Sequence, residues 1–420
     1  MRIAPFRRGN LAGRQPDRIE RGLNGLLDAG LILAEVVAGG DDRAKGAGRA
    51  GFDVDDIRHL LIESLLDPAG DAPAGQLAAH QAAEYADAAA LVQFAAGLEV
   101  VTYEFENVPV ATARALAERV PVYPPPSALE VAQDRLAEKT FFQNLGIATP
   151  PFAPVSSRAE LDAALAQIGL PAVLKTRRLG YDGKGQQVLR TPADAATAWE
   201  ALGGAPLILE GFVPFVRELS ILAARGRDGQ VACYPLVENQ HRDGILRRSL
   251  APAPGLTPAL QAAAEAIARA ALAALDYVGL LAIELFEIDD RRSTAEHGTP
   301  EVSGQSSLLV NEMAPRVHNS GHWSIEGAET SQFEQHLRAV LGWPLGSTAM
   351  RGAAAMVNLI GGWPDPAAVL AVPGAHLHLY GKQPRRGRKV GHITVCAASP
   401  AALSAPLQAI EALVVAREDG

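Results

Sequence analysis

The sequence predicts a mixed α/β protein with a late antiparallel portion, and three observations predict this class. Short apolar runs of strand length alternate with helical stretches through the middle of the chain. A long alanine-rich helix is expected over residues 257–276. After Trp343 the chain becomes β-rich, and a single helix follows the last strand.

Composition and charge limit the possible classes of protein. The 420 residues are 48% hydrophobic with a net charge of −9, which excludes general disorder and indicates about three domains. An acidic chain lacks the broad basic face typical of nucleic-acid binding, although local positive clusters allow anionic small ligands. Cys233 and Cys396 match no zinc spacing and favour a reducing, cytoplasmic setting. No uninterrupted apolar stretch indicates a signal peptide or a membrane span.

The first predicted elements are a helix over 78–97 and a buried strand over 98–106. The segment 121–127 contains three consecutive prolines, which continue neither a helix nor a sheet, so we expect a domain boundary there. A helix then resumes with Ser127 as its N-cap, and Glu130 three residues later completes a capping box.

The remaining elements continue the alternation of strands and helices. Short apolar segments predict strands at 171–176, 207–212, 218–225, 231–237, 279–288, 307–313, 353–360, 375–382 and 389–397. Helical spacing is found at 157–168, 192–202 and 399–416. The polar segment 289–306 has the composition of a surface hairpin loop.

The clearest local signal for chemistry is LKTRRLGYDGKGQ at 174–186. A strand delivers Lys175, and a loop with Gly180, Gly183 and Gly185 follows at once. Glycines let backbone N–H groups approach phosphate oxygens closely, and an upstream lysine neutralises their charge. The spacing is neither a Walker P-loop nor a Rossmann turn, so a flexible hairpin with one exposed lysine stays open as the alternative.

Acidic residues stand at the ends of two strands that follow. Glu210 ends one apolar strand and Glu218 begins the next. Carboxylates there could accept hydrogen bonds from ribose hydroxyls, while the backbone of 211–213 pairs with an adenine edge. An ordinary strand with solvated ends is the alternative.

Two further carboxylates, Glu284 and Glu312, each interrupt an apolar strand, where an unpaired buried charge is costly. On neighbouring antiparallel strands the two groups could share Mg²⁺, which prefers carboxylate and phosphate oxygens. Asn311 could add an amide oxygen. The alternative is a pair of edge carboxylates that face water.

Two polar clusters complete the candidate site. The loop 314–323 carries Arg316, His318, Asn319 and His322, and arginine offers a planar fork for carboxylate or phosphate. Structural histidines are the alternative. A basic cluster near the C-terminus suggests a bound phosphate monoester, with a solvated β-turn as the alternative; it consists of Lys382, Arg385, Arg386, Arg388 and Lys389.

Together these segments resemble the ATP-grasp ligases, and most closely the 5-(carboxyamino)imidazole ribonucleotide synthases of purine biosynthesis. The resemblance covers about residues 66–397, and the string PRVHNSGHW is highly specific. It is carried in order by VTYEFENVP (101–109), the Arg135 helix, GYDGKGQ (180–186), EGFV (210–213), NQHRDGI (239–245), NEMAPRVHNSGHW (311–323) and GKQPRRGRKVGH (381–392).

The resemblance implies an ATP-grasp fold with an N-terminal Rossmann-like domain, here incomplete, and a small β-rich C-terminal domain. The implied division is an unmatched segment 1–65, a partial pre-ATP-grasp domain 66–126, an ATP-grasp domain 127–342 and a C-terminal domain 343–420. The family opens with a strand and a GGGQLG-type turn near the ribonucleotide phosphate. Residues 1–65 contain no such string, and we hypothesise that this segment is out of frame or otherwise replaced, which leaves the N-terminal domain without its first βα unit.

The resemblance also implies a reaction in which ATP phosphorylates bicarbonate, and the carboxyphosphate or its CO₂ carboxylates 5-aminoimidazole ribonucleotide. The expected protein is a cytoplasmic homodimer without nucleic-acid or membrane partners, with ATP and Mg²⁺ as cofactors. The residues implied for ATP are Arg135, Lys175, Gly180, Tyr181, Asp182, Gly183, Lys184, Gly185, Gln186, Glu210, Gly211, Phe212, Val213, Glu218, His241, Asn311 and Glu312. Glu284 and Glu312 are implied for Mg²⁺.

The remaining implied residues act on bicarbonate and the ribonucleotide. Asp182, Arg316, His318 and Asn319 are the expected catalytic groups, with Tyr181 beside them. Tyr181, Glu104, Asn107, Lys382, Arg388 and Lys389 are expected to contact the substrate. Two alternatives remain: another ATP-grasp ligase, such as a formate-using ribonucleotide transformylase, and an inactive nucleotide-binding homologue with an altered N-terminus.

Overall fold

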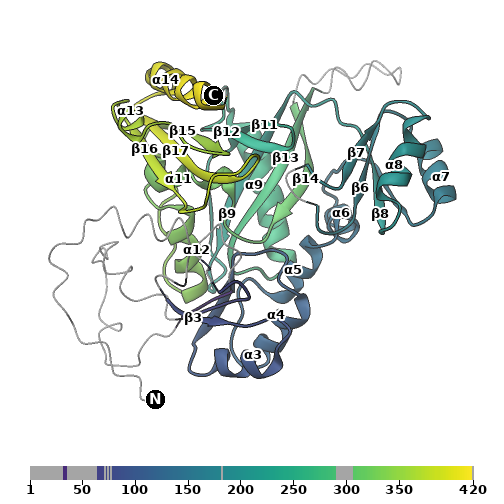
Figure 1. Ribbon diagram of the computed structural model, residues 1–420, viewed down its shortest axis with the longest axis horizontal. Helices are drawn as coiled ribbons and strands as arrows, with labels where there is room; N and C mark the ends of the chain where they lie inside the picture. Colours follow the sequence, from purple (N-terminus) through teal and green to yellow (C-terminus); the bar gives the residue numbers. More distant parts are fainter. Residues whose placement is uncertain are drawn as a thin grey trace.

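The computed structural model describes residues 32–35, 64–70, 72, 75, 78–180, 183–289 and 306–418. These residues form three β-sheets with helices packed against them (Figure 1). The mixed α/β class with a late antiparallel portion is confirmed. None of the helices in the described ranges has the length and apolar character needed to cross a membrane.

The first sheet, of order β3–β2–β1–β4, lies nearest the N-terminus. β2 and β3 are parallel, as in a Rossmann-like unit, whereas β1 is antiparallel to both of its neighbours. The helices pack their apolar side chains against β2 and β4. The elements are β1 (Ile32–Glu35), β2 (Ser64–Asp67), β3 (Ala79–Ala82), β4 (Val100–Tyr103), α3 (Ala88–Ala95) and α4 (Val110–Ala117).

The helix predicted over 78–97 is only partly present. Residues 79–82 form β3 because they pair with β2, and the helix begins only after Asp87. The Asp87 carboxylate caps α3 by accepting hydrogen bonds from two backbone N–H groups. The predicted helix therefore misplaces its first turns.

The predicted N-cap at Ser127 is also wrong. α5 (Pro126–Ala132) begins at a proline, and Pro125 occupies the N-cap position. Proline suits the first helical position because it has no N–H group to satisfy. Glu130 completes no capping box and forms an exposed ion pair with Arg114 instead.

The second sheet, of order β5–β8–β6–β7, forms a small antiparallel lobe that stands apart from the rest of the molecule in Figure 1. α7 and α8 pack on this sheet around a buried apolar core. The lobe places Lys175 in β6 beside Glu210 in β8. Its elements are β5 (Phe152–Val155), α7 (Arg158–Ile168), β6 (Ala172–Thr176), β7 (Gln186–Leu189), α8 (Asp194–Leu202) and β8 (Leu207–Gly211).

The third sheet is the largest and runs in the order β14–β13–β9–β11–β12–β15–β17–β16. β10 (Val231–Cys233) pairs with β9, so the strand predicted over 231–237 is divided between β10 and the start of β11. The path consists of β9 (Arg217–Arg225), β11 (Val237–Arg242), β12 (Ile245–Ala251), β13 (Gly279–Asp289), β14 (Ser306–Ala314), β15 (Ala353–Ile360), β16 (Ala375–Leu379) and β17 (Lys389–Ala397).

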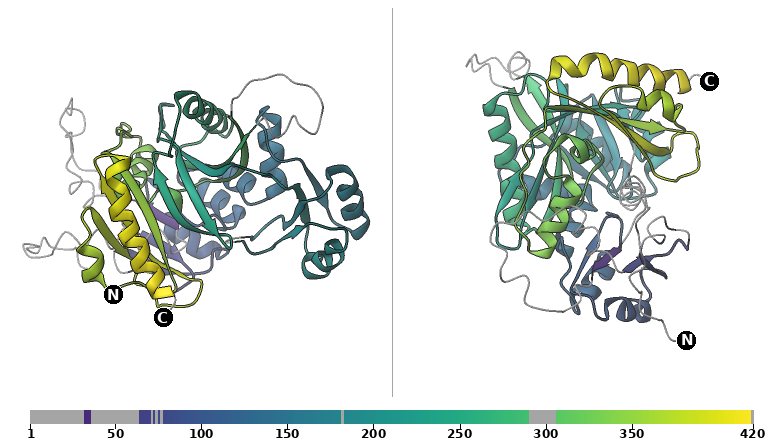
Figure 2. Two further views of the ribbon diagram at one scale, coloured as in Figure 1. Left: turned by 90° about the horizontal axis from the view of Figure 1, so that it is seen from above. Right: turned by 90° about the vertical axis from the view of Figure 1, so that its left-hand side faces the viewer.

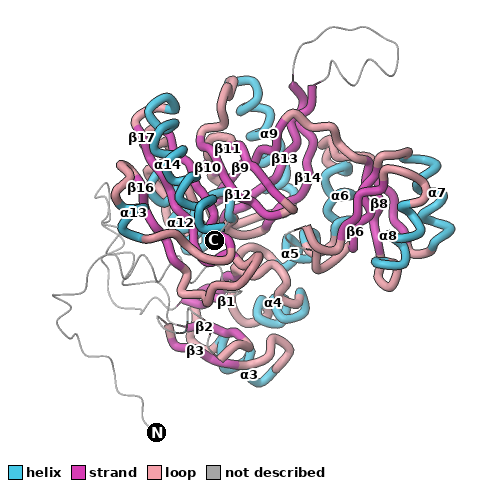
Figure 3. The backbone as a smooth tube through the Cα atoms, turned by 45° about the horizontal axis from the view of Figure 1, so that its top comes forward, coloured by secondary structure: helices cyan, strands magenta, loops and turns pink. Residues whose placement is uncertain are grey.

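The C-terminal strands continue this large sheet, because β15 pairs with β12 (Figure 1). Figure 3 shows strands of this sheet, among them β17, β12, β9 and β13, in magenta. The C-terminal helix α14 (Pro400–Glu418) lies along β15 and β17 and buries Leu403, Leu407 and Ile410 against them (Figure 2). The remaining helices are α6 (Arg135–Asn144), α9 (Pro258–Ala274), α11 (Ser324–Gly327), α12 (Gln332–Leu341) and α13 (Pro366–Leu370).

A buried histidine joins the first sheet to the third. His336 in α12 accepts the Leu280 backbone N–H at Nδ1, with a distance of 3.1 Å. Because a backbone N–H only donates, the ring proton resides on Nε2, and this group donates to Thr102 Oγ1 at 2.8 Å. Leu280 belongs to β13 and Thr102 to β4, so one neutral imidazole links the two sheets.

This link predicts an acid-sensitive stability. Burial lowers the pKa of His336 to about 4, below the ordinary value near 6.5. The unfolded chain therefore binds the proton more readily, and stability is lost as the pH falls from about 6.5 toward 4. We expect the free energy of unfolding of the wild type to fall by about 3 kcal/mol more than that of H336Q between pH 7.5 and 4. Equal losses in urea titrations at the two pH values would contradict this role.

Candidate active site

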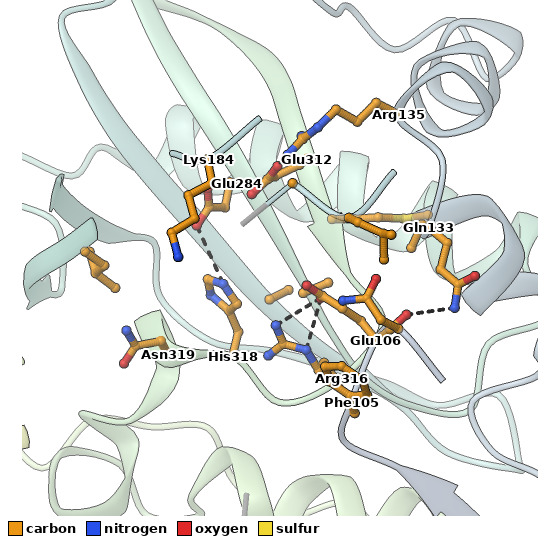
Figure 4. A pocket seen from close by; sticks show the side chains of 18 of the residues that line it. Phe105, Glu106, Gln133, Arg135, Lys184, Glu284, Glu312, Arg316, His318 and Asn319 are labelled. Atoms are coloured by element: carbon orange, nitrogen blue, oxygen red, sulfur yellow. Dashed lines mark hydrogen bonds and ion pairs between the residues drawn. The ribbon is translucent and has the colours of Figure 1, made fainter. Parts of the chain in front are cut away.

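A cavity of about 970 Å³ lies where the three sheets meet. The turn after β4, the small lobe, and strands β9, β11, β13 and β14 all contribute to its wall, together with the loop after β14. Figure 4 shows Arg135 beside Glu312 in one part of the cavity and Arg316 beside Glu106 in another. The site is therefore built from segments far apart in the sequence.

The structure brings together most of the residues proposed from the sequence. Those that line the cavity are Glu104, Asn107, Arg135, Lys175, Gly180, Gly183, Lys184, Gln186, Glu218, His241, Glu284, Asn311, Glu312, Arg316, His318, Asn319 and Lys389. Those that lie outside its lining are Gly185, Glu210, Gly211, Phe212, Val213, Lys382 and Arg388. Tyr181 and Asp182 fall outside the described residues, as does the loop 290–305.

The two strand carboxylates face each other across adjacent strands. Glu284 in β13 is the register partner of Glu312 in β14. Burial and the neighbouring Glu312 raise the pKa of Glu284 to about 7. Burial would also raise the pKa of Glu312, but Arg135, whose Nη1 lies 2.6 Å from Oε2, outweighs it and lowers the pKa to about 2. The pair thus carries one uncompensated carboxyl group, the arrangement that a divalent cation would neutralise.

Arg135 is held in place by the start of its own helix. Asp134 caps α6 by accepting the Leu136 N–H, and its carboxylate also pairs with Arg177 at 2.7 Å. The Arg135 backbone N–H donates to the Arg177 carbonyl oxygen. These contacts tie the first turn of α6 to the end of β6, so Arg135 projects into the cavity from a supported position.

A buried lysine–glutamate cluster connects the small lobe to the rest of the site. Glu210 is only 2% exposed, and its Oε2 lies 2.9 Å from Lys175 Nζ and 3.6 Å from Lys139 Nζ. Burial raises the pKa of Glu210, but the two lysines outweigh it and lower the pKa to about 2. The alternative of a solvated strand end is therefore wrong for Glu210. Its Oε1 is buried and has no hydrogen-bond partner among the described residues.

A second carboxylate interaction lies in the cavity wall formed by β9 and β11. His241 Nδ1 lies 2.9 Å from Glu218 Oε2, and both side chains line the cavity. Burial lowers the pKa of His241, but Glu218 and the nearby Glu284 and Glu312 raise it more, so the pKa lies above its ordinary value. Beside the carboxylate pair, the histidine is therefore protonated more readily than a free imidazole.

The glycine loop follows β6 and closes against two neighbours. Gly183 and Gly185 have positive φ values of 73° and 70°, a conformation that favours glycine. A Cβ atom at Gly185 would lie 2.6 Å from Thr176 Oγ1, and one at Gly183 would lie 3.0 Å from the Gly244 Cα atom. Both positions therefore need glycine if the loop is to lie this close to its neighbours.

The loop after β14 carries an arginine and a histidine in fixed orientations. Arg316 Nη2 lies 2.9 Å from Glu106 Oε2. His318 Nδ1 accepts the Ser320 backbone N–H at 3.3 Å, so the ring proton resides on Nε2, which lies 3.7 Å from Glu284 Oε1 (Figure 4). Burial, then Arg316 and Lys389, lower the pKa of His318 well below its ordinary value. The imidazole is therefore neutral and presents an N–H group.

Three residues in or beside this cavity were not predicted from the sequence. Glu106 pairs with Arg316, Gln133 donates to the Glu106 carbonyl oxygen at 2.9 Å, and Lys139 lies buried next to Glu210. Glu106 stands between Glu104 and Asn107 in the YEFEN string. Its place between two expected substrate contacts could therefore have identified it as a candidate. Nothing in the local sequence distinguishes Gln133 or Lys139 from ordinary helix residues.

The C-terminal basic cluster reaches the cavity through one residue. Lys389 lines the cavity, whereas Arg388 is exposed. Lys382 Nζ lies 5.4 Å from the centre of the Tyr380 ring, within the range of a cation–π contact. A phosphate at this end would therefore meet Lys389 first.

Family models match three stretches of the chain. They are the ribonucleotide synthetase preATP-grasp domain at 58–133, the ATP-grasp domain at 140–333 and the phosphoribosylaminoimidazole carboxylase C-terminal domain at 354–405. The N5-carboxyaminoimidazole ribonucleotide synthase of Pseudomonas aeruginosa is 54% identical over 353 residues, covering 84% of this chain and 93% of that protein. The chain belongs to the N5-carboxyaminoimidazole ribonucleotide synthase family. The resemblance found in the sequence is thereby confirmed, and the chain is an ATP-grasp ligase.

Solved members of the synthase family share this fold. The Thermus thermophilus structure has a TM-score of 0.76 and 59% identity, covering 83% of this chain and 91% of that one. An Aspergillus clavatus synthase in complex with ADP and 5-aminoimidazole ribonucleotide has a TM-score of 0.74 and 32% identity, covering 84% and 91%. These relatives carry the synthase name and not that of a transformylase, which removes the main support for the formate-using alternative.

The N-terminal hypothesis lies largely outside the described part of the chain. The preATP-grasp match begins at residue 58, upstream of Leu66, where the motif resemblance begins. Of the segment 1–65, the structure describes only 32–35 and 64–65. The out-of-frame origin of this segment and the predicted domain bounds stay predictions.

Proposed function

We propose that this protein catalyses the ATP-dependent carboxylation of 5-aminoimidazole ribonucleotide with bicarbonate, giving N5-carboxyaminoimidazole ribonucleotide, ADP and phosphate. One observation carries the proposal. A single cavity joins a cationic end on the small lobe, a carboxylate pair and an arginine–histidine end. The similarity to synthases of this name and to a relative solved with ADP and the ribonucleotide supports the same reaction.

The lobe end of the cavity suits the nucleotide. Phosphoryl transfer needs charge neutralisation and alignment more than a covalent nucleophile. Arg135 and Lys175 supply positive charge there, and the backbone of the glycine loop offers N–H groups to phosphate oxygens. The proposed further ATP contacts are Glu210, Gly211, Phe212, Val213, Glu218, His241 and Asn311, together with Tyr181, Asp182 and Lys184 of the loop.

The carboxylate pair fits a magnesium ion. No group of three or more His, Cys, Asp or Glu side chains suited to a metal occurs in the described ranges, but Mg²⁺ in nucleotide sites typically takes one or two carboxylates and completes its shell with phosphates and water. Glu284 and Glu312 face each other on paired strands and would hold the ion. When bound, the ion neutralises charge on the transferred phosphoryl group.

The remaining groups suit the carboxyl-transfer end. A bicarbonate oxygen attacks the γ-phosphorus and ADP leaves, giving carboxyphosphate. The amine nitrogen of the ribonucleotide then bonds to the carboxyl carbon, directly or after CO₂ is released, and phosphate leaves with the amine proton. Arg316, His318 and Asn319 line the cavity where these anions would be oriented. Lys389, with Lys382 and Arg388, is proposed to meet the ribonucleotide phosphate near Glu104 and Asn107.

A glycine loop that covers the bound nucleotide would exclude water from carboxyphosphate, which hydrolyses readily. A cytoplasmic homodimer completes the proposal. Both Cys233 and Cys396 are free.

The decisive experiment measures ADP release with and without bicarbonate and 5-aminoimidazole ribonucleotide. We expect full turnover only when both are present, and formation of the carboxylated ribonucleotide in step with ADP. An equal rate of ADP release with and without the two substrates would refute the proposed reaction. ATP binding without any turnover would favour the inactive homologue, and formate in place of bicarbonate tests the transformylase alternative directly.

A further inference from the structure

Gln332 lies behind the cavity wall and contacts the loop that carries His318 and Asn319. It is the first residue of α12, and its side chain is fully buried. It is absent from the cavity lining, so it touches no bound substrate. A buried amide needs partners for its oxygen and for both of its N–H groups, and all of these partners lie in the loop.

The amide makes a two-point contact with the backbone of one active-site residue. Gln332 Oε1 accepts the His318 N–H at 2.9 Å, and Gln332 Nε2 donates to the His318 carbonyl oxygen at 2.8 Å. The backbone N–H only donates, and the carbonyl only accepts, so the orientation of the amide is fixed by His318 itself. The contact resembles one rung of a β-ladder, and it sets the position of the His318 Cα atom.

The same orientation determines the tautomer of a second histidine. The remaining N–H group of Gln332 points at His322 Nδ1, 2.9 Å away. An amide nitrogen only donates, so His322 Nδ1 accepts and the ring proton resides on Nε2. His322 lines the cavity and is only 7% exposed. One side chain therefore controls both the place of His318 and the proton of His322.

The loop packs so closely on Gln332 that its side chain has no space to move. A Cβ atom at Gly321 would lie 2.3 Å from Gln332 Oε1. The Gln332 backbone N–H donates to Ser324 Oγ, which donates to the Gly321 carbonyl oxygen at 2.6 Å. The loop is thus packed directly on Gln332, and a change at this amide moves the loop itself.

We propose that Gln332 is a positioning residue for the carboxyl-transfer end of the site: it holds the 318–322 loop in register with the cavity and keeps the His322 proton on Nε2. The kinetic part of this role rests on the proposed function, whereas the tautomer of His322 does not. Figure 4 shows the result, with His318 directed at Glu284.

The same helix provides a matched control. Gln335 is also fully buried, and it makes the same two-point contact with a backbone, because its Nε2 donates to the Gly346 carbonyl oxygen and its Oε1 accepts the Gly346 N–H, both at 2.8 Å. Gln335 does not line the cavity. The two glutamines differ in what they hold and not in how they hold it.

The experiment compares Q332E with Q335E. In each variant the new carboxylate still accepts the backbone N–H but no longer donates to the carbonyl oxygen, so both proteins should lose thermal stability. In Q332E the carboxylate also faces His322 Nδ1, which must then carry a proton in order to pair with it. We expect kcat of Q332E to fall by about 100-fold, the cost of a small misplacement at a reacting centre, with an unchanged KM for ATP. Q335E should keep the wild-type kcat.

A spectroscopic measurement separates this role from stability and from the identity of the reaction. In protein labelled with ¹⁵N-histidine, with signals assigned through H322Q, wild type and Q335E should show His322 protonated at Nε2 only, and Q332E should show a proton at Nδ1. An unchanged His322 signature in folded Q332E, or equal kcat values for the two variants, would overturn the proposal. If the wild type lacked the proposed turnover, the proposed function would fail, and the His322 signature would still decide the positioning role.

Discussion

Replacing Glu312 by glutamine is expected to abolish turnover, lowering kcat by about three orders of magnitude. The carboxylate of Glu312 pairs with Arg135 at 2.6 Å and faces Glu284 across the strand pair. An amide removes the negative charge that both Arg135 and a magnesium ion require. The loss should appear in the steady-state rate and in a weaker affinity for Mn²⁺, which can be followed by its electron paramagnetic resonance signal.

Glu287 supplies the control for this substitution. It lies on β13 as Glu284 does, is buried, and pairs with Arg217 through a close contact outside the cavity. E287Q should therefore lower the melting temperature, because a neutral amide replaces one of the two carboxylates that pair with Arg217 and only Glu238, at 3.1 Å, remains. The value of kcat should stay at that of the wild type. If E312Q kept its Mn²⁺ affinity and its rate, Glu312 would be neither a metal ligand nor a charge partner in the reaction.

Two of the three C-terminal strands could be predicted to the residue, whereas β16 ends at Leu379 and not at residue 382 as predicted. β15 over 353–360 and β17 over 389–397 match the prediction at both ends. Each is a dense apolar run bounded by turn-forming residues, and both faces are buried in the extended sheet. When a strand is buried on both faces, its apolar run in the sequence is enough to predict where the strand begins and ends.

α12 was missed for the opposite reason. Its buried face carries Gln332, Gln335 and His336, which a hydrophobic pattern assigns to solvent. Each of these polar groups is satisfied by a partner distant in the sequence, such as Thr102 for His336. Tertiary hydrogen bonds let these polar side chains be buried, and the local sequence does not show which partners the fold will bring. The edge strand β3 was misread because its alanine-rich residues favour helix until β2 pairs with them.

The site shows the same division. Glu284 and Glu312 could be found because a charge inside an apolar strand demands an explanation. Lys139 could not, because its position in α6 looks like an exposed helix residue until the small lobe places Glu210 beside it. The local sequence identifies a charged residue in an apolar strand, because such a residue is unusual there. It cannot identify a residue whose role depends on a contact with a residue distant in the sequence.

Replacing Glu210 by glutamine should destabilise the protein by about 3–5 kcal/mol, because it removes the carboxylate that lies between two buried ammonium groups. Lys139 is fully buried, and Lys175 is also largely buried. The Glu210 carboxylate compensates the charge of both ammonium groups. Burial alone would raise the pKa of Glu210, and the two lysines outweigh this effect. The loss should be visible as a lower free energy of unfolding in urea, and as a higher KM for ATP because Lys175 is no longer oriented.

The pH dependence of the free energy of unfolding provides a second test of this prediction. Burial lowers the pKa of Lys139 below its ordinary value, so the folded state binds its proton less readily than the unfolded chain does. The stability of a protein with such a group rises as the pH rises toward the ordinary lysine pKa. Without Glu210 to favour the charged form, the lowering becomes larger, so E210Q should be less destabilised at pH 9 than at pH 6.5.

A double variant tests the cause. If the uncompensated charge of Lys139 is responsible, adding K139M to E210Q removes that charge and should recover part of the lost free energy of unfolding. The double variant should also lose most of the difference in stability between pH 6.5 and pH 9. If K139M/E210Q is no more stable than E210Q, the destabilisation comes from altered packing of β8 and not from charge. Recovery, in contrast, would establish that the Glu210 carboxylate compensates the buried charge of Lys139 beside the nucleotide end of the cavity.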